Sequence, residues 1–139
     1  MLLSKEEYTE LYGEIPDPVF LLISVQSEQY LRSATTGVDG YNKLQNLSAD
    51  SPAFTIVKLC AMEVARFLHL VQNVAIDGKI VTSISSGNES VSYSATEVEK
   101  AATDQSAKAK ACISIVRNWL SSVQDDNGVN LLYMGAYPV

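Results

Sequence analysis

Apolar positions recur at helical spacing over most of the chain. The pattern predicts four helices, at about residues 5–12, 18–35, 52–73 and 97–123. Each begins after a residue that can cap a helix N-terminus, namely Ser4, Asp17, Ser51 and Thr96. The third helix is apolar almost all round, which is typical of a central helix covered on several sides. The fourth carries one apolar stripe, and its first half is rich in alanine, which favours a close helical neighbour.

Between the third and fourth helices the period of the pattern changes from that of a helix to that of a strand. Residues 79–85 and 89–94 are rich in β-branched side chains, alternate in polarity and flank Gly87-Asn88. A glycine-first pair between two alternating runs predicts a two-residue β-hairpin. An isolated hairpin is only marginally stable in water, so we expect this one to lean on the helices or on a second molecule.

Two further segments lack helical periodicity. Residues 37–51 are rich in turn formers and predict an irregular loop, which Tyr41, Leu44 and Leu47 can pin to the core. Residues 129–139 are apolar and predict an extended tail that a monomer would not readily leave in water. The predicted fold is mainly α. It is a four-helix bundle-like domain over residues 1–128, with a hairpin at about 79–94 before the last long helix and a docking tail over 129–139.

Length and composition predict one compact domain without a membrane span. The chain has 139 residues, of which 47% are hydrophobic and 19% charged. Its longest apolar region, residues 59–76, is interrupted by charged and polar side chains and therefore predicts a buried helix. No secretion signal is visible at the start, so we expect the chain to stay in the cytoplasm after synthesis. Cys60 and Cys112 lie in apolar helical patterns and are predicted to be buried, reduced thiols.

The charge distribution disfavours tight binding to nucleic acid or lipid. The net charge is −6, and residues 1–50 hold eight acids against three bases. Gripping a phosphate backbone requires clustered lysines and arginines, which this count does not provide. We therefore expect weak or repulsive contact with DNA and no basic helix that binds a membrane surface.

Residues with catalytic potential are few and scattered. The only histidine is His69, and neither a nucleophile elbow nor a phosphate-binding loop occurs. A zinc site would need three or four ligands, whereas the chain offers one histidine and two distant cysteines. Acid pairs lie at helix starts or after a helix end, where solvated or capping roles are usual. The sequence predicts no catalytic site, no metal and no cofactor, and hence a protein that is not an enzyme.

The order of these features resembles the head-tail connector, or adaptor, proteins of long-tailed double-stranded DNA bacteriophages. The resemblance spans the chain and rests on residues 3–8 (Leu-Ser-Lys-Glu-Glu-Tyr), the serine-rich hairpin 85–94 and residues 131–135 (Leu-Leu-Tyr-Met-Gly). The chain departs from the family in its longer loop 37–51 and in Met134, where a basic residue is commoner.

The resemblance implies a structural neck protein of the virion that is made in the host cytoplasm. Such a subunit would join a ring of about a dozen copies on the portal protein, extend the DNA channel and support the next neck or tail protein. Genomic double-stranded DNA would be a weakly contacted cargo. The acidic balance fits this role, since a conduit should not grip what passes through it.

Two segments are the candidate contact sites under this hypothesis. The tail is expected to contact the portal or a neighbouring subunit, and the hairpin to meet another subunit or the downstream neck protein; packing within the chain is the alternative for both. The alternative functions are another head-completion or neck protein, or a small helical binding or regulatory protein. The tail residues are Leu131, Leu132, Tyr133, Met134 and Tyr137, and the hairpin residues are Ile84, Gly87, Asn88, Val91 and Tyr93.

Overall fold

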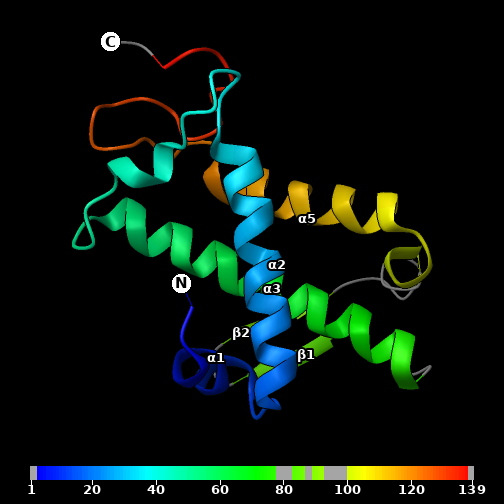
Figure 1. Ribbon diagram of the computed structural model, residues 1–139. Coiled ribbons are helices and arrows are strands. Elements are labelled where there is room, and N and C mark those ends of the chain that lie inside the picture. The colour runs from blue at the N-terminus through cyan, green and yellow to red at the C-terminus, as the bar shows by residue number, and fades with distance from the viewer. Residues whose placement is uncertain (1–2, 78–82, 87–88, 93–99, 138–139) are drawn as a thin grey trace.

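The computed structural model describes residues 3–77, 83–86, 89–92 and 100–137 (Figure 1). The fold is mainly α, as the sequence predicts. Its elements in chain order are α1 (Lys5–Tyr12), α2 (Asp17–Thr35), the 3₁₀ turn η1 (Lys43–Asn46), α3 (Pro52–Asp77), β1 (Ser83–Ser86), β2 (Glu89–Ser92) and α5 (Gln105–Leu120). Residues 100–103 form a further helical turn ahead of α5.

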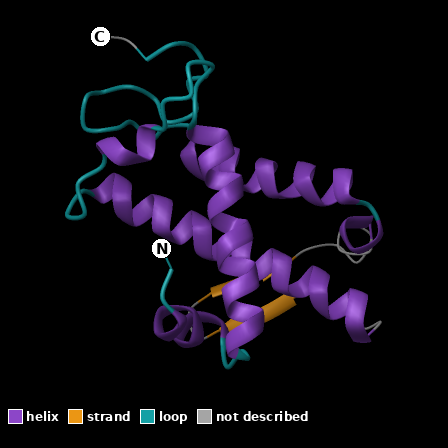
Figure 2. Cartoon of the chain, in the orientation of Figure 1, coloured by secondary structure: helices purple, strands orange, loops and turns teal. Residues whose placement is uncertain are grey.

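Three helices form the body of the molecule. In Figure 1, α2 crosses in front of α3, and α5 extends to one side above the second half of α3. Helix α3 contacts both α2 and α5, and α2 also contacts α5, so each of the three is packed on the other two. Helix α1 lies near the lower end of α2 beside the two strands, whereas the loops and the C-terminal segment gather at the opposite end (Figure 2).

Helix α3 supplies most of the buried core, which confirms the prediction that it is central. Burying each large aliphatic side chain stabilises the fold by about 1.5–3 kcal/mol relative to leaving it exposed. The flanking helices meet α3 through Leu31 of α2 and through Cys112, Val116 and Leu120 of α5, all fully buried. The fully buried residues of α3 include Val57, Cys60, Ala61, Val64, Ala65 and Phe67.

The polar stripe of α3 serves to attach α1. Lys58 forms an ion pair with Glu7, with 2.7 Å between Nζ and Oε2. Two turns further on, the guanidinium carbon of Arg66 lies 4.9 Å from the centre of the Tyr12 ring, a cation–π contact. Interruptions that exclude a membrane span in the sequence are therefore contacts between two helices in the fold.

The helix starts agree with the sequence at two positions and differ at a third. The Ser4 hydroxyl accepts from the Glu7 amide at 3.2 Å, and Ser51 does the same for Phe54 at 3.2 Å. The prediction that Asp17 caps the second helix is wrong, because Asp17 is the first helical residue and Pro16 occupies the cap position. The Asp17 carboxylate instead pairs with the Lys5 ammonium.

The prediction of one long helix over residues 97–123 is also wrong. Within the described part, Asp104 interrupts the helix with extended backbone angles, φ −135° and ψ 112°. Its carboxylate accepts from the Ser106 amide at 2.9 Å, so Asp104 caps a new helix, α5. Aspartate competes with the backbone for such amides, and helical periodicity alone does not reveal which partner wins.

The strands pair with each other alone among the described residues. β1 and β2 run antiparallel with Ser83 opposite Ser92 and Ile84 opposite Val91. The remainder of the predicted hairpin, residues 79–82, 87–88 and 93–94, lies outside the described residues, as does the predicted cap Thr96.

Candidate interaction surface at the C-terminal segment

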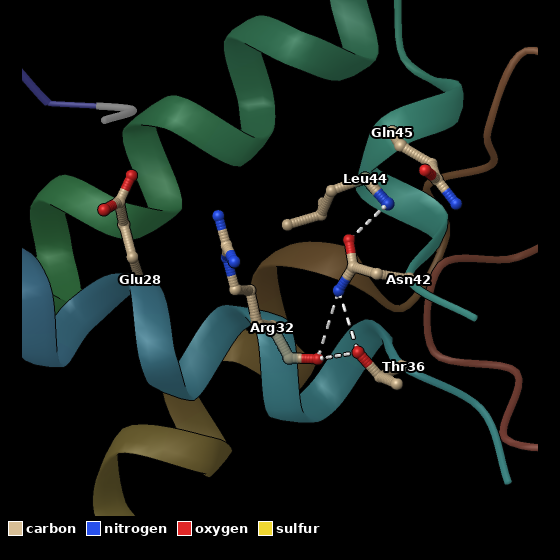
Figure 3. Close-up of a pocket in the computed structure, with 6 residues that line it drawn as sticks. All are labelled: Glu28, Arg32, Thr36, Asn42, Leu44 and Gln45. Carbon is tan, nitrogen blue, oxygen red and sulfur yellow. Dashed lines mark hydrogen bonds between the residues drawn. The ribbon is translucent and has the colours of Figure 1, made fainter. Parts of the chain in front are cut away.

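The loop after α2 is held in place by one asparagine. Thr36 and Asn42 form an isolated antiparallel bridge. The Asn42 amide nitrogen donates to Thr36 Oγ1 at 2.8 Å and to the Arg32 carbonyl at 3.4 Å. Its oxygen accepts from the Leu44 amide at 3.0 Å (Figure 3). These bonds connect the end of α2 to η1 and set the position of the loop between them.

The same residues line an open hollow beside the loop. The Arg32 guanidinium and the Leu44 side chain extend toward each other, with Glu28 one turn before Arg32 on α2 (Figure 3). The hollow therefore combines one cation and one anion with an apolar wall. The Asn42 amide is already engaged on both its atoms, so its role here is to build the loop.

A second turn follows α5 and is organised by Asp125. Its Oδ1 accepts from the amides of Asn127 and Val129, both at 2.9 Å. Gly128 closes the turn at φ +82°, where glycine is favoured. Oδ2 of Asp125 accepts from the Asn46 amide at 3.0 Å and from the Tyr137 hydroxyl at 2.6 Å. Asp125 thus links the turn, η1 and the chain end.

The ionisation of Asp125 reflects these bonds. The residue is only 5% exposed. Burial acts to raise the pKa of its carboxyl, but the hydrogen bonds from Tyr137, Val129, Asn46 and Asn127 together outweigh it. The pKa therefore lies below the ordinary value of 3.8, and the charged form is the stabilised one.

The C-terminal segment lies directly against the loop after α2. The Val38 amide donates to the Met134 carbonyl at 2.8 Å, and the Tyr137 amide donates to Asp39 Oδ2 at 2.9 Å. The Tyr41 and Tyr137 rings lie 4.5 Å apart between centres. Lys43 is buried, and its ammonium donates to the Tyr133 carbonyl. Residues almost a hundred positions apart thereby form one rigid cap.

The predicted tail contacts are divided between the core and the surface. Leu131 is fully buried and its amide donates to the Val123 carbonyl at 3.0 Å, so packing within the chain, the alternative left open, is its arrangement. Leu132 is half-buried against the core. Tyr137 is half-buried beside Tyr41. The segment is therefore not an extended tail, since it turns back onto its own domain.

The remaining tail residues form an exposed apolar surface. Tyr133 is 47% exposed and Met134 41%. Val38, 81% exposed, lies next to Met134 through their backbone hydrogen bond. We call Val38, Tyr133 and Met134 the C-terminal surface. The sequence did not single out Val38, because nothing local indicates that a loop valine meets the chain end.

The predicted hairpin contacts are described only in part. Ile84 and Val91 stand opposite each other in the ladder of β1 and β2. Gly87, Asn88 and Tyr93 lie outside the described residues.

The residues with catalytic potential have structural surroundings. His69 Nδ1 lies 3.2 Å from the Tyr8 hydroxyl, and burial lowers the pKa of the imidazole. Cys60 and Cys112 are buried free thiols, as predicted, and burial raises the pKa of each to about 12. Within residues 3–77, 83–86, 89–92 and 100–137, no three histidine, cysteine, aspartate or glutamate side chains group to hold a metal ion.

Comparison with known proteins adds no relative. No protein-family model matches the chain, and no curated protein or solved structure is significantly similar to it. In the described part of the chain, no helix combines the length and the apolar character needed to span a membrane.

Proposed function

We propose that this protein is a structural subunit of a bacteriophage neck, a head-tail connector that binds the portal protein as a ring and receives the next neck or tail protein. The observation that carries the proposal is the C-terminal surface. Exposed apolar side chains held in a fixed geometry favour a protein partner, because little conformational entropy remains to be lost on binding. They lie in the segment Leu131–Gly135, which is part of the resemblance to connector proteins.

Charge supports the same role. The chain has a net charge of −6, which suits a subunit that lines a DNA channel without holding the genome. Under this proposal DNA is a cargo and the partners are proteins. The finer description of the fold, a four-helix bundle-like domain whose hairpin meets a neighbouring subunit or the downstream neck protein, belongs to the same proposal.

The proposal is tested by binding to purified portal rings from the same genome. Removing the chain after Gly128 would also remove Leu131 from the core, so point variants are the better probe. We expect the full chain to add a symmetric layer visible by electron microscopy, and V38D and M134Q each to weaken binding by at least about tenfold.

The matched control is L59Q. Leu59 on α3 is 39% exposed, close to the 41% of Met134, but lies on a different element. We expect L59Q to bind the portal as the unchanged chain does. If the unchanged chain adds no layer, or if L59Q and M134Q lose binding equally, the portal-contact proposal is wrong. A DNA band shift with a steep salt dependence would then favour the regulatory alternative.

A further inference from the structure

One face of α5 is an open groove with a low floor. Its lining comes from Ala107, Lys110, Ala111, Ser114 and Ile115 together with Phe67 of α3. The five α5 positions recur every three or four residues and therefore form one stripe along the helix. The alanines leave space for larger side chains of another helix. From Ala107 to Ile115 the groove extends for about 12 Å at the helical rise.

This face is positively charged in an acidic protein. Between Gln105 and Leu120 there are three bases, Lys108, Lys110 and Arg117, and no acid. Lys110 is exposed at the groove, and Lys100 lies at its edge. The groove is therefore suited to an apolar segment that carries negative charge.

The outer face of α2 has the complementary properties. Leu21 and Val25 lie one turn apart and are 56% and 40% exposed, so they form an apolar ridge that nothing in the described chain covers. Residues 14–31 contain three acids, Glu14, Asp17 and Glu28, and no base. From Leu21 to Glu28 the face spans about 10 Å, close to the length of the groove.

We infer that the α2 ridge of one copy docks into the α5 groove of a second copy. Large side chains meet small ones, and an acidic surface meets a basic one. Because ridge and groove are different surfaces, each bound copy still offers one of each, and the contact is head-to-tail. Such a contact closes into a ring or continues as a filament. The inference deepens the proposed function, since it names the surfaces through which ring subunits meet.

The first test is the mass of the full chain in solution. Sedimentation from about 10 μM to 1 mM at low salt should show association that weakens as sodium chloride is added. The ridge variant L21Q/V25Q and the groove variant K110E/S114E alter exposed side chains only. Each should raise the dissociation constant by at least about tenfold, with an unchanged helical circular dichroism spectrum.

The second test separates a head-to-tail contact from a symmetric one. The ridge variant keeps an intact groove, and the groove variant keeps an intact ridge. Mixed together they should form a one-to-one dimer and no larger species, whereas each alone stays monomeric. The control M134Q should associate as the unchanged chain does.

Three outcomes overturn the inference: a chain that is monomeric at every concentration, ridge and groove variants that associate normally, or a mixture that forms no dimer. The result is distinguishable from failure of the proposed function. Loss of portal binding in M134Q with normal self-association concerns only the portal contact. Self-association that fails while portal binding persists concerns only the ridge and groove.

Discussion

At the scale of single residues, Asp125 has the largest number of structural connections. It accepts hydrogen bonds from its own turn, from η1 and from Tyr137. A buried acceptor that loses its partners costs about 1–3 kcal/mol, and bonds to a charged group are the stronger ones. We predict that D125N lowers the free energy of unfolding by about 1–3 kcal/mol at pH 7, measured by urea denaturation.

The same carboxylate gives the protein a dependence on acid. Because its pKa in the fold lies below the ordinary 3.8, the stabilisation is fully present above that value and is lost as the pH falls through the folded pKa. The difference in stability between the unchanged chain and D125N should therefore shrink below pH 3.8. A difference that stays constant down to pH 2 would contradict the role of the charged form.

Gly37 is a second residue with a specific requirement. A Cβ at this position would lie 2.6 Å from the backbone oxygen of Gly135, and the backbone cannot yield as a flexible side chain can. We predict that G37A destabilises the fold by about 1–3 kcal/mol in thermal or urea unfolding. The control is G40N, where φ is +80°, which asparagine tolerates, and no atom lies within 4 Å of the new Cβ. Equal losses in both variants would mean that the close approach is not the cause.

At the scale of elements, the start of α5 depends on Asp104. The Asp104 carboxylate satisfies an amide in the first turn, and the helix continues into the basic face argued above. We predict that D104A lowers stability by about 0.5–2 kcal/mol, whereas D104N, which keeps an acceptor oxygen, loses less. Urea denaturation monitored by circular dichroism measures both. If the two variants are equally stable, the helix start does not rely on this cap.

At the scale of the whole molecule, charge and exposed apolar surface are unevenly placed. The acids around α2 and the bases of α5 lie on different helices, and the C-terminal surface occupies the end where loops gather (Figure 2). The two proposed contacts therefore use separate surfaces. This separation is why M134Q and L21Q/V25Q should affect portal binding and self-association independently.

The sequence by itself determined the helical class, the central place of α3 and the buried thiols. These properties follow from local periodicity, in which apolar spacing states which side of a helix must be covered. Helix ends were less accurate, because Asp17 and Asp104 can each cap, pair with a lysine or continue a helix. Only the surrounding chain decides among these at the cost of a few tenths of a kcal/mol to about 2 kcal/mol.

Only the tertiary structure decided the character of the candidate site. Leu131 and Met134 are both apolar and three residues apart, yet one lies in the core and the other is 41% exposed. The difference arises because the turn at Asp125 and the loop after α2 bind each other through residues almost a hundred positions apart. Contacts of that range leave no periodic signal along the chain, whereas the helices they connect do.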